Sequence, residues 1–70
     1  MRRTPVSSSN LASVGYDAAT KMLEIKFNSG SVYIYSGVPA SVYTGLMHAS
    51  SHGSYFHAHI RNSYSYRRIR

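Results

Sequence analysis

Hydrophobic and polar residues alternate with a period of two in the first half of the chain. The alternation is clearest over residues 22–27, where Leu23, Ile25 and Phe27 alternate with polar or charged neighbours. This pattern is typical of a strand that buries one face. The stretches before and after it are also rich in strand-forming residues, namely residues 11–16 and 31–35. The pattern therefore predicts three consecutive antiparallel strands.

Turn-forming residues separate these strands. Asp17 begins the first connection, and an Asp side chain readily accepts a hydrogen bond from the backbone two residues later. Gly30 ends the second connection and can adopt the positive φ that a short hairpin loop requires. We therefore expect the three strands to form a meander.

The hydrophobic period changes after Pro39, a residue that fits the first turn of a helix. One helical face then collects the apolar side chains Val42, Tyr43, Leu46 and Met47. Gly45 destabilises a helix by ~1 kcal/mol relative to Ala, so its presence predicts close packing against a neighbour. A second helix is predicted after a break at 51–54, with Ser51 or Ser54 as its N-cap. One face of this helix again collects Tyr55, Phe56, His59 and Ile60.

After Asn62 the alternation returns over residues 63–70, which indicates either a fourth strand at the sheet edge or a basic tail. We favour a short strand or extended segment. The predicted fold is α+β, with a three- to four-stranded antiparallel β-meander and two short helices packed on one face.

The order of several short motifs resembles the KTSC domain family. These motifs are Gly15-Tyr16-Asp17, Phe27, Gly30, Val32-Tyr33-Ile34-Tyr35, Val38-Pro39, Val42-Tyr43, Ala49-Ser50-Ser51-His52-Gly53, Phe56 and Ile60-Arg61. No single motif is specific, but the ordered set covers about residues 8–66, and the pair Tyr33 and Tyr35 is its hallmark. The family is named for its occurrence at the C-terminus of some lysyl-tRNA synthetases, and it also includes small bacterial and phage proteins. The resemblance implies a single α+β domain and suggests RNA binding.

The charges are unevenly distributed. Eight Lys and Arg residues against two acids give a formal net charge of +6, and residues 27–60 carry no charged side chain apart from histidine. Such a surface favours polyanionic partners, nucleic acid first and an anionic membrane second. The alternative is a charge that only maintains solubility. Residues 1–9 are expected to be a flexible, basic, Ser-rich leader that precedes a single domain at 10–70.

The composition argues against several classes of protein. The chain contains no cysteine, which excludes disulfide scaffolds, Cys-ligated zinc and thiol catalysis. Its longest strongly apolar run, 32–35, is far shorter than the ~20 residues of a membrane span. Residues 4–10 lack the apolar core of a signal peptide. We therefore expect a cytoplasmic protein without membrane contact.

Neither a metal site nor a catalytic site is expected. His48 and His52 are four residues apart and His57 and His59 two apart, but no third ligand accompanies either pair. The two acids lie in the predicted hairpin, and no nucleophile-elbow sequence occurs. We predict a non-enzymatic protein without a cofactor.

Basic and aromatic side chains interleave in the C-terminal segment. Arginine binds phosphate bidentately and stacks on rings, and tyrosine stacks on unpaired bases. The predicted nucleic-acid site, with RNA as the expected partner, consists of Arg61, Arg67, Arg68, Tyr64, Tyr66, Lys26, Tyr33 and Tyr35. Because Tyr33 and Tyr35 share one strand face, they are either a stacking platform or part of the core.

The break before the second helix suggests a separate anion site. Ser51, Gly53 and Ser54 would present backbone N–H groups to a phosphate at the helix start. The simpler interpretation is an ordinary connection with a serine cap. A further alternative is a protein–protein adaptor that uses exposed aromatic residues and an edge strand, as a monomer or weak homodimer.

Overall fold

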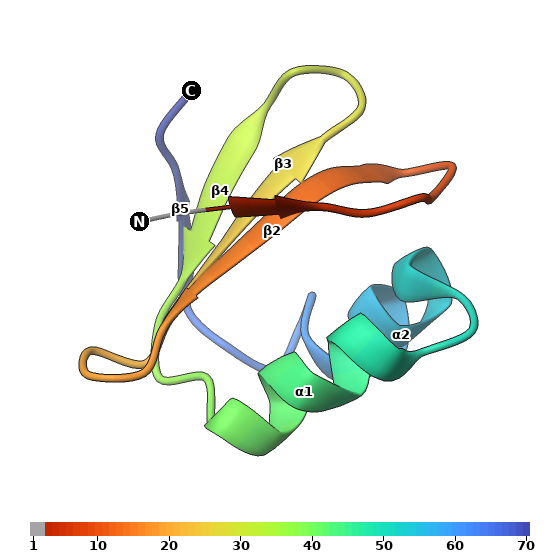
Figure 1. Cartoon of the computed structure of the whole chain (residues 1–70). Coiled ribbons are helices and arrows are strands. Elements are labelled where there is room, and N and C mark those ends of the chain that lie inside the picture. Colours follow the sequence, from red (N-terminus) through yellow and green to blue (C-terminus); the bar gives the residue numbers. More distant parts are fainter. Residues whose placement is uncertain (1–2) are drawn as a thin grey trace.

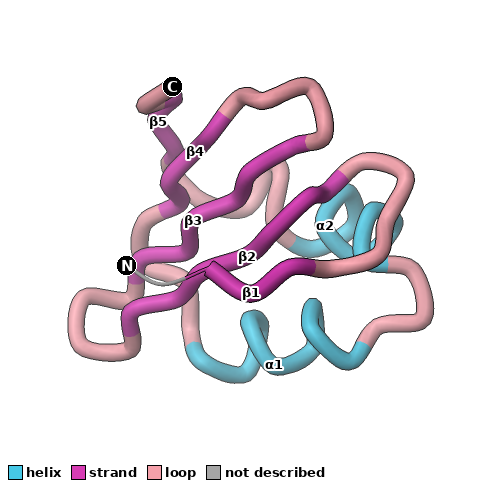
Figure 2. Tube along the Cα trace, turned by 45° about the horizontal axis from the view of Figure 1, so that its top comes forward, coloured by secondary structure: helices cyan, strands magenta, loops and turns pink. Residues whose placement is uncertain are grey.

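Five antiparallel strands form a single sheet in the order of the chain (Figure 1). The computed structural model describes residues 3–70. Its strands are β1 (Arg3–Pro5), β2 (Leu11–Asp17), β3 (Met22–Phe27), β4 (Val32–Tyr35) and β5 (Tyr66–Arg68). Helices α1 (Ala40–His48) and α2 (His52–His59) connect β4 to β5 and lie on the same side of the sheet (Figure 2). The predicted α+β fold is confirmed, including the C-terminal strand, but the sheet has one strand more than expected.

The additional strand is β1, which lies within the segment expected to be a flexible leader. Arg3 pairs with Gly15 and Pro5 with Ser13, so this segment extends the sheet beyond β2. Proline is tolerated here because β1 is an edge strand, where a missing N–H need not break a ladder. The expectation of a loose leader over 1–9 is therefore wrong for Arg3–Pro5, while residues 1 and 2 lie outside the described part of the chain.

A β-bulge in β2 allows apolar residues three positions apart to lie on the same buried face of the sheet. The register shifts between Leu11 and Ser13, so that Leu11 pairs with Phe27 and Val14 with Ile25. Leu11 and Val14 are three residues apart, but both are fully buried. An extra residue in a bulged strand restores the alternation of faces after the irregularity.

Local sequence signals are present as expected. Asp17 Oδ1 accepts a hydrogen bond from the Ala19 N–H at 3.0 Å, and Gly30 has φ +97°. Ser51, rather than Ser54, caps α2, because its Oγ accepts from the Ser54 N–H at 3.2 Å.

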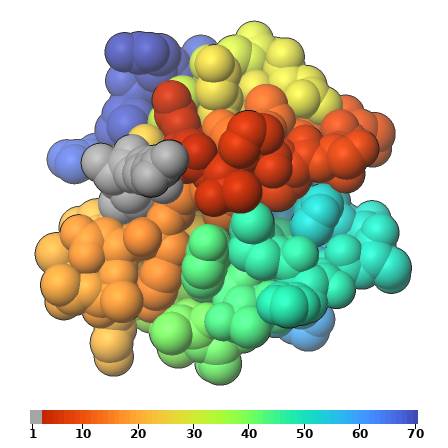
Figure 3. Space-filling model, viewed as in Figure 1, coloured from red at the N-terminus to blue at the C-terminus, as the bar shows by residue number. Residues whose placement is uncertain are grey.

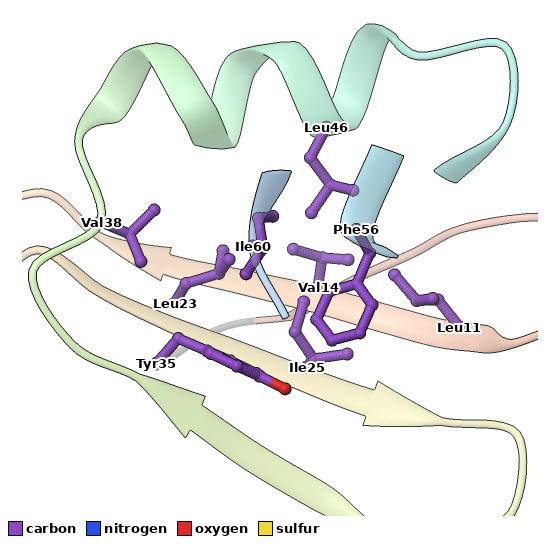
Figure 4. Packing of buried hydrophobic residues seen from close by; sticks show 9 residues of the cluster. All are labelled: Leu11, Val14, Leu23, Ile25, Tyr35, Val38, Leu46, Phe56 and Ile60. Carbon is purple, nitrogen blue, oxygen red and sulfur yellow. The ribbon is translucent and has the colours of Figure 1, made fainter. Parts of the chain in front are cut away.

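The core lies between the sheet and the two helices (Figure 4). Leu46 from α1 and Phe56 from α2 point toward the strands, together with Ile60 at the end of α2 (Figure 4). The strands and the β4–α1 connection contribute the other buried members of this cluster, Leu11, Val14, Leu23, Ile25, Tyr35 and Val38. His59 is exposed and lies against Tyr55, with ring centroids 4.4 Å apart.

Candidate nucleic-acid interface

A groove of about 600 Å³ is lined by β4, β5, α2 and the segments that adjoin them. Its aromatic lining consists of Phe27, Tyr33, Tyr35, Phe56 and Tyr66. Polar residues on its other sides include Asn10, His57, Arg61 and Asn62. None of the described residues that line it is Asp or Glu. We refer to this feature as the aromatic groove.

The pairing of β4 with β5 assembles the aromatic lining. Tyr66 lies opposite Tyr35 in the register, and its ring centroid is 5.4 Å from that of Tyr35 and 5.7 Å from that of Tyr33. Phe56 from α2 meets Tyr35 edge to face, with centroids 5.5 Å apart. Residues from β4, β5 and α2 thus form one continuous cluster of rings.

The two tyrosines of β4 have different roles in this cluster. Tyr35 is 3% exposed and belongs to the core, whereas Tyr33 is half-buried and Tyr66 is 58% exposed. Tyr35 therefore supports the groove from below, and Tyr33 and Tyr66 supply the accessible ring surface. The sequence left open whether Tyr33 and Tyr35 form a stacking platform or part of the core. Tyr35 belongs to the core, whereas Tyr33 is partly accessible.

Burial changes the acidity of the Tyr35 hydroxyl. Desolvation raises its pKa to about 12, and the neighbouring Tyr66 and Tyr33 hydroxyls act in the same direction. Arg61 acts against this shift because a nearby cation stabilises the phenolate. Tyr35 is therefore protonated and uncharged near neutral pH.

The end of α2 positions a cation at the groove. Arg61 directly follows the helix, and its N–H donates to the Phe56 carbonyl at 3.0 Å. Its Nη1 lies 3.2 Å from Nδ1 of His57, one turn earlier. A guanidinium N–H donates to this nitrogen when it is the unprotonated nitrogen of the imidazole. The exposed Arg61 side chain can therefore meet an anion next to the aromatic surface.

The structure divides the predicted nucleic-acid site between the two faces of the sheet. Tyr33, Tyr35, Tyr66 and Arg61 line the aromatic groove. Arg68 lies opposite Tyr33 in the register, and so it shares the face of the sheet that carries the helices.

The remaining predicted residues lie elsewhere. Arg67 pairs with Ile34 and Lys26 with Val32, which places both cations on the opposite, helix-free face. Tyr64 is half-buried and packs against the core. The interleaved arginines and tyrosines therefore do not form one continuous patch.

Several polar residues of the groove were not predicted from the sequence, among them His57, Asn10 and Asn62. The spacing of His57 and Arg61 by four residues was a usable signal, since such residues are neighbours on a helix. Asn10 had no such signal, because only the folding of β2 beside α2 brings it to the groove.

A second hollow of about 500 Å³ lies at the start of α2 and is lined by Ser51, Gly53 and Ser54. The Ser51 hydroxyl is already engaged as the helix cap. A Cβ at residue 53 would lie 3.0 Å from Asn10 Nδ2, so the Asn10 side chain lies close above this helix start. The hollow and the aromatic groove share Asn10 and His57, and they are neighbouring parts of one surface.

The histidines have distinct local contacts. His52 Nδ1 lies 2.8 Å from the Leu46 carbonyl at the end of α1, so this side chain satisfies a helix terminus. Within residues 3–70, no three His, Cys, Asp or Glu side chains come together in a way that could hold a metal ion. Within the same residues, neither helix is long and apolar enough to cross a membrane.

Comparison with known proteins identifies the family. Residues 7–64 match the KTSC domain. The chain belongs to the KTSC domain family. Its fold agrees with the crystal structure of a KTSC domain protein from Yersinia pestis, with a TM-score of 0.96 and 40% sequence identity. That match covers 99% of this chain and 97% of the other, so the two share the whole KTSC fold.

Relatives of this KTSC domain occur as small proteins and as parts of large ones. An uncharacterized protein of Stutzerimonas stutzeri is 43% identical over 56 residues, which cover 80% of this chain and 79% of that protein. A lysine–tRNA ligase of Trichormus variabilis is 41% identical over 54 residues. That match covers 77% of this chain but only 10% of the ligase. The resemblance inferred from the ordered motifs is thus confirmed, and the KTSC domain is a small module within these ligases.

Proposed function

We propose that this KTSC domain is a small, non-catalytic, cytoplasmic module that binds single-stranded RNA in the aromatic groove. The observation that carries the proposal is the accessible ring surface of Tyr33 and Tyr66, whose centroids are 5.7 Å apart, next to the exposed Arg61. Aromatic rings beside a guanidinium are the combination that single-strand binding uses.

The dimensions and chemistry of the groove support this ligand. Its volume of about 600 Å³ lies within the ~300–1,000 Å³ that small-molecule sites occupy, enough for an unpaired base with its sugar and phosphate. A base stacked on Tyr66 would contribute ~1–3 kcal/mol. The Asn10 and Asn62 amides offer donors and acceptors to a base edge. The lack of carboxylates among the described lining residues also favours an anionic ligand.

The relatives support RNA over other polyanions. Several carry this domain within a lysine–tRNA ligase, an enzyme that by its name acts on tRNA. A basic, aromatic module attached to such an enzyme is suited to contact single-stranded parts of that RNA. The net charge of +6 adds general attraction to the phosphate backbone.

An amide-resolved NMR titration tests the proposal. Short single-stranded RNA and, separately, tRNA are added at ~0.15 M salt, where exposed charges are already partly screened. We expect the amide shifts to concentrate on Tyr33, Tyr66 and residues 57–62, and to weaken as salt is added. Shifts confined to Ser51–Ser54 would instead support a phosphate site at the start of α2. Absent or evenly spread shifts would reject the proposed function.

A matched pair of variants separates stacking from general hydrophobic contact. Tyr66→Ala removes a ring from the groove, whereas Ile69→Ala removes a side chain that is 47% exposed near the same strand and does not line the groove. We expect Tyr66→Ala to weaken binding by about 10-fold, as the loss of one stacked base implies, and Ile69→Ala to leave it unchanged.

A protein–protein adaptor is the second candidate function. Its support is that β5 is an edge strand that begins with Tyr66 and is followed by Ile69. These are the two large hydrophobic residues most exposed in the described chain. An open edge can pair with a partner strand or with a second copy as a weak dimer. Salt distinguishes the two functions, because phosphate contacts weaken steeply with salt and an apolar interface does not.

A further inference from the structure

We infer that the bound RNA strand does not end in the aromatic groove but passes around the β5 edge onto the helix-free face. There, Arg67 and Lys26 bind the phosphates that neighbour the stacked base. This inference rests on the proposed function and adds the path of the strand. It also implies a preference for single strands over duplexes.

The register of β5 supplies the first argument. Tyr66 and Arg68 lie opposite Tyr35 and Tyr33 on the side of the helices, and Arg67 lies opposite Ile34 on the other side. Successive residues of one three-residue edge strand thus present an aromatic ring, a cation and a second cation to alternating faces. All three side chains are exposed. Because β5 is the edge strand that adjoins the aromatic groove, a chain bound in the groove reaches the other face most directly by crossing this edge.

The charges of the helix-free face supply the second argument. One row of neighbouring residues crosses the five strands, consisting of Arg3, Gly15, Glu24, Ile34 and Arg67. Glu24 is the one acidic residue of this row. Arg3 Nη1 lies 3.5 Å from Glu24 Oε1. This ion pair reduces the repulsion that Glu24 would exert on a phosphate. Lys26 and Arg67 then remain as cations about 12 Å apart, two strand spacings across the sheet and two residues along it.

The edge itself favours RNA over a second copy of the chain. Two β5 strands paired edge to edge would bring their Arg67 and Arg68 side chains close together, and like charges across strands are destabilising. A phosphate backbone neutralises the same charges. Because a duplex stays straight over ~150 base pairs, it cannot turn around one edge strand, whereas a single strand can.

The space-filling view agrees with an accessible path. The C-terminal segment (blue) lies at one side of the surface, apart from α1 (green) (Figure 3). On the face in view, α1 therefore does not cover the C-terminal segment.

The test compares a short and a long RNA. Diuridylate is long enough for the groove alone, while decauridylate is long enough to reach the helix-free face. The double variant Arg67→Gln/Lys26→Gln removes the two proposed phosphate contacts. Lys21→Gln, which removes one charge in the β2–β3 turn, is the matched control. Binding is measured at salt concentrations from about 0.1 M to about 1 M, because each phosphate contact to a single strand contributes about −0.7 to the log–log salt slope.

We expect the double variant to flatten the salt slope for decauridylate by about 1.4, which is roughly a 25-fold loss of affinity at the low-salt end. Its affinity for diuridylate should remain unchanged. Lys21→Gln should shift decauridylate binding by less than about 2-fold, since it removes only general attraction. Arg67→Lys, with Lys26 intact, should retain most of the slope, and the unchanged diuridylate affinity of the double variant shows that its loss is not due to unfolding.

The outcomes separate the two proposals. If Tyr66→Ala weakens both RNAs but the double variant binds decauridylate like the wild type, the path around β5 is wrong and the proposed function stands. Equal losses for both RNAs in the double variant also reject the path. If the wild type binds neither RNA, both proposals fall. A duplex that binds as tightly as decauridylate would overturn the path as well.

Discussion

The ring of Tyr55 in α2 lies directly against Gly45 of α1, where a larger residue would have no room. A Cβ at residue 45 would lie 2.7 Å from Tyr55 Cζ and overlap its hydroxyl oxygen. The sequence predicts such a close approach because a glycine inside a helix otherwise destabilises it. The contact fixes how closely the two helices pack.

Replacing this glycine tests the contact. Gly45→Ala should gain about 1 kcal/mol of helix propensity but lose ~1–3 kcal/mol to overpacking, so the net free energy of unfolding should fall. Urea denaturation followed by circular dichroism measures the change. Thr44→Ala, at an exposed position of the same helix, is the control and should be neutral or stabilising. A Gly45→Ala variant more stable than the wild type would show that the helices separate at little cost.

Alkaline pH should destabilise the protein through Tyr35. Its folded-state pKa is raised to about 12 by burial, while an unfolded tyrosine titrates near 10. The stabilisation is therefore complete below pH ~10 and is lost as pH rises from ~10 toward ~12, by up to 1.36 kcal/mol per pH unit. Tyr35→Phe keeps the ring but cannot ionise, so its stability should fall less over this range. Urea unfolding of both proteins from about pH 9 to about pH 11 measures the difference. Identical pH dependence would contradict the raised pKa of Tyr35.

Sequence information was sufficient where the determining interactions are local. The alternation in residues 22–27 and the Ser51 cap depend on neighbours within a few residues, and Gly45 indicates a close contact because glycine is unfavourable inside a helix. These features appear in the structure as predicted. The strand β1 was missed because the basic, Ser-rich residues 1–9 show no alternation, and only the pairing of Arg3–Pro5 with β2 makes them a strand.

The candidate site was only partly predictable for the same reason. The tyrosines and arginines of the C-terminal segment led to the prediction of base stacking and phosphate binding. Their assignment to faces, however, depends on the pairing of Tyr66 with Tyr35, residues far apart in the sequence. One-residue shifts of register exchange the faces of a strand. Which of Tyr66 and Arg67 faces the helices was therefore outside what the pattern determines.

The histidines should differ in their effect on stability. His52 Nδ1 contacts the Leu46 carbonyl at 2.8 Å, so His52→Ala leaves the end of α1 without this partner and should cost about 0.5–1.5 kcal/mol. His48→Ala, at the exposed end of the same helix, should change stability by less than about 0.5 kcal/mol. Thermal or urea unfolding of the two variants measures both values. Equal effects would mean that the His52 contact does not persist in solution.

Arg3 and Glu24 should be energetically coupled across β2. Their side chains meet at 3.5 Å over the glycine that separates them in the sheet, and they are only 28% and 12% exposed. A double-mutant cycle with Arg3→Ala and Glu24→Ala should give a coupling of about 0.2–1 kcal/mol, which decreases with added salt because ions screen the pair. A parallel cycle with Lys21→Ala and Glu24→Ala should give a coupling near zero, since Lys21 lies in the turn and no ion pair joins it to Glu24 in the described chain. Zero coupling in the first cycle would show that the Arg3–Glu24 ion pair does not persist in solution. Glu24 would then oppose phosphate binding on the helix-free face, and the RNA path around β5 would lose one of its supports.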